Sequence, residues 1–336
     1  MNSPTNEDLV ANWQDEPAPL LPLLHAFHDR DGYLSEESIA AVSAGLKIPI
    51  AELFATITFY HHFAREAPGQ SAPRVCTGPI CALHGADALL ASLDGATPMA
   101  CAGRCDGPIP VIKGQQVIIG TNAEQLSPTA SALPVANPDG CEECVFADIR
   151  AEGRSTLAGY RQSGGYTALL QAFTQSPPEL IALITDSQLA GRGGAGFPTG
   201  QKWQAVANAS GEPKSVVCNA DEGEPGCFKD RAVLEHDPHA VLEGILLAAF
   251  ATGSTRGFIY LRYEYPETCA LLEIAIAEAR TANLIGDNIL GSAFSCELYI
   301  RRGAGAYICG EEGSLLNSLE GKHPYPRNRP PFPVTH

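Results

Sequence analysis

Apolar side chains near the start of the chain recur at helical spacing. Between residues 17 and 65 they fall three and four positions apart, as on one face of an amphipathic helix. Ser35, with two glutamates directly after it, has the form of a helix N-cap and predicts a second helix. A third helix is expected over 51–63. We interpret His61 and His62 as partly buried residues at its end rather than metal ligands, because no carboxylate or cysteine pattern accompanies them.

The pattern changes between residues 74 and 120. Arg74 and Val75 open a short apolar run typical of a strand, and Gly85 to Leu93 has helical spacing. Residues 110–119 alternate around Lys113-Gly114, which predicts a hairpin. This order of strand, helix and hairpin predicts a small α/β domain.

Polar and proline-rich residues over 121–146 predict a linker. Two helical stretches follow over 157–184. From Lys214 onward, apolar strands alternate with longer helices, which predicts an α/β domain. The expected strands are 215–218, 257–261 and 295–300, and the expected helices are 238–251 and 266–282.

Composition narrows the classes of function. The 336 residues are enough for two or three domains, and 22 basic against 38 acidic side chains give a formal charge of −16. This charge argues against nucleic acid and anionic lipid as partners. No apolar run approaches the roughly 20 residues of a membrane span, and the polar N-terminus lacks the form of a signal peptide. We therefore expect a cytoplasmic protein with no membrane insertion, in which cysteines are metal ligands or buried thiols.

Four of the eleven cysteines form two loops. Four residues separate Cys76 from Cys81, and three separate Cys101 from Cys105, with small residues between them. Structural zinc sites usually have tighter spacings, so these loops favour a [2Fe–2S] cluster over zinc. Cys141 and Cys144 form a further pair in the linker, which is either incidental, a redox-active dithiol or part of a shared metal site.

A glycine-rich stretch from Gly191 to Lys202 is the strongest sign of a nucleotide or flavin. Five glycines lie within ten positions, with Arg192 among them. Glycines let backbone N–H groups surround a phosphate, and the cations offset its charge. The stretch matches G-x-G-x-x-G, but a helix is expected before it and Pro198 directly after it. We therefore reject an ordinary Rossmann fold.

Two acidic stretches accompany this loop. One follows an expected strand and holds Asn219, Asp221, Glu222 and Glu224, and the other follows Tyr307. Carboxylates near a phosphate site require donors such as ribityl or ribose hydroxyls and carboxamides. The simpler alternative is that these acids cap helices or face solvent.

Long motifs in this region resemble a known family. They read Gly-Arg-Gly-Gly-Ala-Gly-Phe-Pro-Thr-Gly, Asn-Ala-Asp-Glu-Gly-Glu-Pro-Gly, Gly-Ala-Gly-Ala-Tyr-Ile-Cys-Gly-Glu-Glu and Pro-Pro-Phe-Pro. Residues 160–333 are similar to the NADH-oxidising flavoprotein subunit of respiratory complex I, a family shared with the diaphorases of NAD-reducing hydrogenases and NAD-dependent formate dehydrogenases. Residues 17–120 resemble its partner, a helical segment with a thioredoxin-like [2Fe–2S] domain.

The resemblance implies a set of site residues. The expected FMN ligands are Gly191, Arg192, Gly193, Gly194, Lys202, Asn219, Asp221, Glu222, Tyr307, Gly310 and Glu311. The expected NADH contacts are Phe197, Glu224, Glu312 and Phe332. The [2Fe–2S] ligands are Cys76, Cys81, Cys101 and Cys105. Hydride transfer is carried by FMN, so no side chain is expected as a catalytic base.

The resemblance also implies a domain order. We expect a helical segment over 1–66, a thioredoxin-like [2Fe–2S] domain over 67–125, a linker over 126–155 and an α/β FMN/NADH domain over 156–336. The family continues past Pro333 with a further flavin loop, a ubiquitin-like domain and the four cysteines of a [4Fe–4S] cluster. This chain has no counterpart of them, so we expect either a fragment or a chain without that electron exit.

The implied activity is that of a diaphorase that passes a hydride between NAD(H) and FMN and single electrons to iron–sulfur centres. The expected partners are the iron–sulfur and catalytic subunits of a formate dehydrogenase, a hydrogenase or complex I, with formate dehydrogenase favoured. Two alternatives are a non-catalytic electron-transfer or assembly module that binds only the cluster, and a zinc-stabilised nucleotide-binding regulator.

Overall fold

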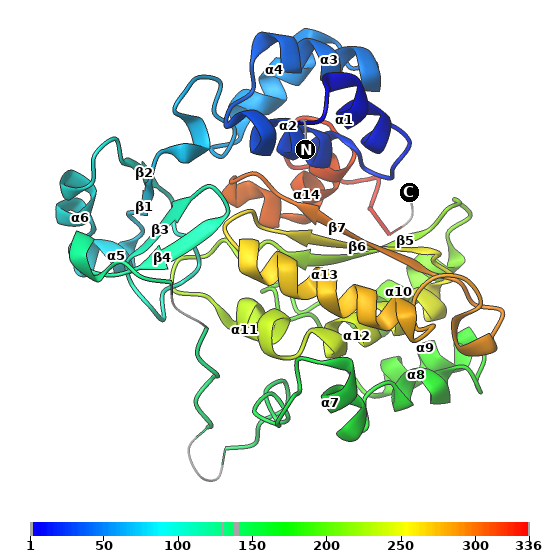
Figure 1. Cartoon of the computed structure of the whole chain (residues 1–336). Helices are drawn as coiled ribbons and strands as arrows, with labels where there is room; N and C mark the ends of the chain where they lie inside the picture. Colours follow the sequence, from blue (N-terminus) through cyan, green and yellow to red (C-terminus); the bar gives the residue numbers. More distant parts are fainter. Residues whose placement is uncertain (1–2, 129–130, 138–140, 335–336) are drawn as a thin grey trace.

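A computed structural model gives the arrangement of the chain and describes residues 3–128, 131–137 and 141–334. The opening helices lie across one side of the larger sheet, and the smaller sheet stands beside it (Figure 1). Strands and helices alternate through most of the chain, so the α/β class expected from the sequence is confirmed.

The opening segment is helical, as expected. Ser35 accepts a hydrogen bond from the amide of Ser38 and caps its helix, and Gly32 ends the preceding helix at a φ of 82°. The four helices are α1 (Asn6–Trp13), α2 (Leu20–Asp31), α3 (Glu36–Leu46) and α4 (Ile50–Phe59). Within the described part of the chain no single helix could cross a membrane, although the bent pair α3 and α4 has a suitable length and composition.

The smaller sheet carries the strand and hairpin predicted for residues 74–120. Its strands are β1 (Arg74–Cys76), β2 (Thr97–Met99), β3 (Pro110–Lys113) and β4 (Gln116–Ile119), in the order β2-β1-β3-β4. β1 is parallel to β2 and antiparallel to β3, and β3 and β4 form the hairpin. The expected helix is α6 (Ala86–Ser92), but the sequence did not predict α5 (Pro79–Leu83), which lies inside the first cysteine loop.

The larger sheet is parallel throughout. Its strands β5 (Ser215–Ala220), β6 (Arg256–Leu261) and β7 (Glu297–Arg302) lie side by side in chain order. The connections run through α11 (Lys229–His236), α12 (Pro238–Thr252) and α13 (Pro266–Thr281). The remaining helices are α7 (Leu157–Gln162), α8 (Thr167–Ala172), α9 (Pro177–Asp186), α10 (Thr199–Asn208) and α14 (Glu312–Leu319).

Two hydrophobic cores cover the faces of this sheet. Leu246 of α12, Leu272 of α13 and Ile259 of β6 belong to one core, and they are fully buried. Tyr260 of β6 belongs to the other core, where it meets Leu24 of α2 together with residues of α14. The crossover helices α12 and α13 therefore lie on one face, and the opening helices fill the opposite face (Figure 1).

Candidate functional site

A polar cavity lies at the carboxyl edge of the larger sheet. Parallel strands bring the segments that follow them to one edge, which is the usual ligand edge of such sheets. Here the segment after β5 meets the segment after β7, because the side-chain amide of Asn219 donates to the carbonyl of Gly310 at 2.9 Å. We call residues 219–227 the flavin loop.

The cavity has a volume of about 790 Å³. Nine of the eleven predicted FMN ligands and one predicted NADH residue line it. They are Arg192, Gly193, Gly194, Asn219, Asp221, Glu222, Tyr307, Gly310 and Glu311, together with Glu224. The wall formed by described residues does not include Gly191 or Lys202.

The glycine-rich loop leaves room for a ligand. Gly194 and Gly196 have φ angles of 102° and 61°, which favour glycine, and a Cβ on Gly193 or Gly194 would meet nothing within 4 Å. The amide of Gly191 donates to the carbonyl of Phe197 at 2.9 Å and ties the base of the loop. Open backbone beside a polar cavity fits close approach by a flavin phosphate or ribityl chain.

The acidic residues have different partners. Glu222 accepts hydrogen bonds from the amides of Asp230 and Arg231 and so caps α11, and Glu311 accepts one from Ser314 and caps α14. Both acids therefore cap helices, as the simpler alternative from the sequence proposed, and they also line the cavity. Glu224 accepts a hydrogen bond from the Tyr307 hydroxyl at 3.1 Å.

Asp221 has a carboxylate oxygen that lacks a hydrogen-bond donor. Its Oδ2 is buried and has no partner among the described residues. Burial, with Glu264 nearby, raises the pKa of Asp221 to about 7, although Arg262 lowers it. An orphaned carboxylate oxygen in the cavity wall fits a ligand that brings hydroxyl or amide donors, such as a flavin.

Apart from Glu224, the predicted NADH residues lie outside the described wall of the cavity. Phe197 and Phe332 are 53 % and 52 % exposed, and neither belongs to the described cavity wall. Glu312 pairs with Lys202 at 3.2 Å. Arg329, which the sequence reasoning missed, pairs with both Glu312 and Glu311. Its place in a proline-rich tail gave no motif to identify it.

The four predicted cluster cysteines come together beside the smaller sheet. Cys76 ends β1, Cys81 lies in α5, and Cys101 and Cys105 follow β2. The Sγ atoms of Cys101 and Cys105 lie 3.6 Å apart. Backbone amides point at the sulfurs: Ala102 donates to Cys76 and Gly103 to Cys101, at 3.4 and 3.5 Å. Such donors stabilise the negative charge of an iron–sulfur cluster, so the loops fit one.

The spacing of these thiols favours two irons over one zinc. In the described ranges, the one group of three or more ligand atoms all within 4.8 Å of each other is His28, Asp29 and His62. In that part of the chain, no three cysteine sulfurs therefore lie within 4.8 Å of one another, which is looser than the compact tetrahedron around a single zinc ion.

The histidine group itself does not have the form of a metal site. Arg74 donates to Nδ1 of His62 and the amide of Ala64 donates to Nε2 of His28. In each ring one nitrogen therefore accepts a hydrogen bond and the other carries the proton, so neither nitrogen has a free lone pair for a metal. This outcome agrees with the structural role expected for His62.

The flavin loop touches the cluster loop, residues 101–106. The amide of Gly226 donates to Sγ of Cys105 at 3.3 Å. Two buried arginines from the larger domain, Arg231 and Arg262, reach carbonyls of the cluster loop. The sequence reasoning missed both arginines because their partners lie more than a hundred positions away in the chain.

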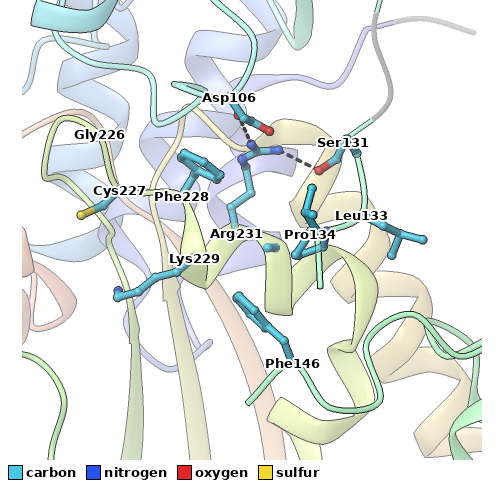
Figure 2. A pocket seen from close by; sticks show the side chains of 13 residues that line it. Asp106, Ser131, Leu133, Pro134, Phe146, Gly226, Cys227, Phe228, Lys229 and Arg231 are labelled. Atoms are coloured by element: carbon cyan, nitrogen blue, oxygen red, sulfur yellow. Dashed lines mark hydrogen bonds and ion pairs between the residues drawn. The ribbon is translucent and has the colours of Figure 1, made fainter. Parts of the chain in front are cut away.

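Arg231 also binds the linker (Figure 2). Its guanidinium donates to Asp106 at 2.5 Å and to Ser131 at 3.0 Å. Below these bonds, Pro134 and Phe146 of the linker face α11 across a mostly apolar cavity of about 510 Å³. Cys141 and Cys144 are exposed free thiols, and neither lines this cavity. Their role stays a prediction.

Comparison with known families identifies both parts. Residues 184–336 match the Nuo51 FMN-binding domain of complex I, and residues 6–103 match the thioredoxin-like [2Fe–2S] ferredoxin family. Each match covers less than half of the chain and gives the family of that part alone. The match to the FMN-binding domain contains the cavity. The match to the [2Fe–2S] family contains Cys76, Cys81 and Cys101, and Cys105 lies two residues beyond its end. The predicted resemblance and fold are confirmed.

Relatives with known names cover different shares of the chain. The alpha subunit of the NAD-reducing hydrogenase HoxS of Cupriavidus necator is 33 % identical over 97 % of this chain and 59 % of its own length. A subunit of the NADH-quinone oxidoreductase of Aquifex aeolicus is 52 % identical over 52 % of this chain and 41 % of its own length. The chain thus spans less than two thirds of the length of each of these relatives.

A solved structure supports the same arrangement. An NAD⁺-reducing [NiFe]-hydrogenase in its air-oxidised state has a chain with a TM-score of 0.73 and 29 % identity. The match covers 96 % of this chain and 57 % of that chain. The order of the two domains is therefore shared with a hydrogenase chain.

Proposed function

We propose that the chain is the NADH-oxidising diaphorase module of a larger enzyme. The observation that carries the proposal is the contact between the cavity and the cluster, where Gly226 of the flavin loop donates to Cys105. When bound, FMN accepts a hydride and gives up single electrons. The protein supplies the pocket, the charges around it and the short path to the cluster.

Each part of the cavity has a role in this proposal. Arg192 and the open glycines receive the phosphate, and Asp221 accepts a hydrogen bond from the bound flavin. Tyr307, an expected FMN contact, is paired with Glu224, an expected NADH contact, so the flavin and the nicotinamide nucleotide would meet at this pair. The predicted contacts of Phe197, Phe332 and Glu312 with NADH, and of Lys202 and Gly191 with FMN, stay part of the proposal.

Reconstitution tests the proposal directly. We expect the chain supplied with FMN, iron and sulfide to show flavin absorbance and a reduced [2Fe–2S] EPR signal, and to reduce ferricyanide with NADH. A cluster signal without NADH turnover would support the non-catalytic electron-transfer module instead. Zinc in place of iron, found by metal analysis, would contradict both proposals.

We propose NADH rather than NADPH as the nucleotide. Glu224 is exposed at the cavity and carries a negative charge, which would repel a 2′-phosphate. We expect the ratio kcat/KM to be at least about tenfold higher for NADH, which corresponds to ~1.4 kcal/mol. Equal ratios for the two nucleotides would contradict this role of Glu224.

The identity of the partner enzyme is a separate question. Iron–sulfur and catalytic subunits are the expected partners, because the named relatives are subunits of an NAD-reducing hydrogenase and of NADH-quinone oxidoreductases. Formate dehydrogenase, favoured from the sequence because of the domain fusion, stays a proposal. Affinity purification of the chain from its own cells, followed by assays for formate and hydrogen oxidation, separates these cases.

A further inference from the structure

A single buried guanidinium connects the flavin loop with the cluster loop. Arg262 follows β6 directly, and it is 4 % exposed. Its NH2 donates to the carbonyl of Cys101 at 2.5 Å, and its NH1 donates to the carbonyl of Glu222. One side chain therefore holds a cluster-ligand residue on one side and a flavin-loop residue on the other.

Two acids lie near the charge of Arg262: Glu264, which pairs with it directly, and Asp221. Glu264 is 5 % exposed and accepts from Nε and NH2 of Arg262 at 3.1 and 3.0 Å. The other arginine at the cluster loop differs, because Arg231 lies between two carboxylates, those of Asp106 and Glu235. Among the described residues, Arg262 thus forms an ion pair with one carboxylate and Arg231 with two.

The cluster loop fits closely around this side chain. A Cβ on Gly103 would lie 2.8 Å from NH1 of Arg262 and 2.1 Å from the hydroxyl oxygen of Tyr265. The guanidinium therefore cannot move away without opening the interface between the two domains. Its position relative to the four cysteines is fixed by packing as well as by hydrogen bonds.

A nearby fixed charge changes how readily a cluster accepts an electron. Reduction adds one negative charge to the cluster and its thiolates, and the reduction potential depends on local charge and hydrogen bonds. A buried cation beside Cys101 stabilises the reduced form, and a buried carboxylate stabilises the oxidised form. Arg262 and Glu264 therefore act in opposite directions.

We propose that Arg262 is a positioning residue that raises the reduction potential of the [2Fe–2S] cluster and, through the Glu222 carbonyl, links it to the flavin loop. This role rests on the proposed function, because it requires the cluster to be present. It assigns to the FMN-binding domain a residue that tunes the cofactor of the other domain.

The test is an EPR-monitored redox titration of the full chain after reconstitution with iron and sulfide. We expect R262Q to lower the midpoint potential by an amount equivalent to about tenfold in the reduction equilibrium, ~59 mV for one electron. E264Q should raise it by a similar amount. The double variant R262Q/E264Q should return close to the wild-type value, because the net charge is unchanged.

The opposite signs separate charge from general damage. A purely structural role predicts that both single variants shift the potential in the same direction, and this result would overturn the proposal. The matched control is the half-exposed pair of Arg280 and Glu297, which joins the far end of α13 to β7. R280Q and E297Q should leave the potential unchanged.

Three further outcomes are decisive. If R262Q does not fold, R262K retains the charge and should keep a near-normal potential, while E264Q still has to raise it; a lowered potential in E264Q would overturn the role. A wild-type chain without a cluster signal would overturn the proposed function and this role with it. If the wild-type cluster signal is normal and neither single variant shifts the midpoint potential, the role of Arg262 is overturned and the proposed function is not.

Discussion

Gly103 shows how one missing side chain lets two domains approach each other. It lies between Cys101 and Cys105, its φ is 67°, and its carbonyl accepts hydrogen bonds from Arg231 and Tyr265. A side chain at this position would overlap the Tyr265 hydroxyl. Both the backbone angle and the close contact therefore require glycine.

We predict that Gly103→Ala destabilises the chain by roughly 2–4 kcal/mol, because backbone strain adds to the steric overlap. The matched control is Gly114→Ala in the β3–β4 turn, where φ is 59° and a Cβ would meet nothing within 4 Å. The control should cost about 1–2 kcal/mol from strain alone. Thermal unfolding and cluster content measure both variants, and equal losses would contradict the role of the interface.

Residue spacing predicted some of the site and missed the rest for a physical reason. Cys76 and Cys105 were found because metal ligands leave a pattern within a short stretch of sequence. Arg262 and Arg231 left none, because each follows or sits in an ordinary strand or helix and gains its role from the opposite domain. Local motifs therefore cannot identify residues whose partners lie in the other domain.

The helix α11 depends on a residue of the flavin loop. No side chain of its own N-cap residue, Phe228, caps it, and Glu222 accepts from the amides of Asp230 and Arg231 instead. The loop that lines the cavity thus also completes the first turn of a crossover helix. A change in this loop must affect the helix.

We predict that Glu222→Ala weakens α11 by about 1–2 kcal/mol, the usual cost of a lost cap. Amide hydrogen exchange in α11 should speed up by roughly 5–30-fold in the flavin-free protein. Glu224→Ala is the matched control, since Glu224 is exposed in the same loop and its side chain bonds to Tyr307 rather than to α11. Equal protection of α11 in the two variants would contradict the capping role.

Strands were easier to predict than short helices. The strands β5 and β6 contain apolar runs. β7 has three charged residues and differs from its expected range by two positions at each end. The sequence did not predict α10 or α11. α10 contains a glycine and a lysine, and α11 contains four charged residues, and both have few apolar positions. Their helical form comes from packing and from capping partners elsewhere.

Three parts of the chain meet around two buried histidines, His25 and His62. His25 donates to the carbonyl of Gly303 after β7, and His62 stacks on Tyr263 with ring centroids 4.3 Å apart. Tyr263 belongs to the core of the smaller sheet. The opening helices, the cluster domain and the larger sheet therefore share one junction, which no local pattern in the sequence could show.

We predict that the chain loses stability as the pH falls below about 6.5. Burial, with Arg74 and Arg302 nearby, lowers the pKa of His28 to about 4, and burial lowers the pKa values of His25 and His62 well below 6.5. The unfolded chain therefore binds more protons between pH 6.5 and 4, and acid favours unfolding. His28 alone should cost roughly 2 kcal/mol between pH 7 and 5.

Urea unfolding at pH 7.5, 6.0 and 5.0 measures this loss. His28→Gln removes one titrating group and should flatten the dependence, because glutamine does not bind a proton in the unfolded state. His84→Gln is the control, since His84 is exposed and should leave the pH profile unchanged. Constant stability from pH 7.5 to 5.0 would contradict the neutral, buried histidines.

The covalent connection between the domains has a consequence for how the Gly226–Cys105 contact forms. Because both loops belong to one polypeptide, each sees the other at an effective concentration in the millimolar range, whatever the amount of protein present. Dilution therefore cannot separate the flavin loop from the cluster loop, as it could if the loops belonged to two separate subunits. Even a weakly complementary surface between the loops suffices to keep them in register.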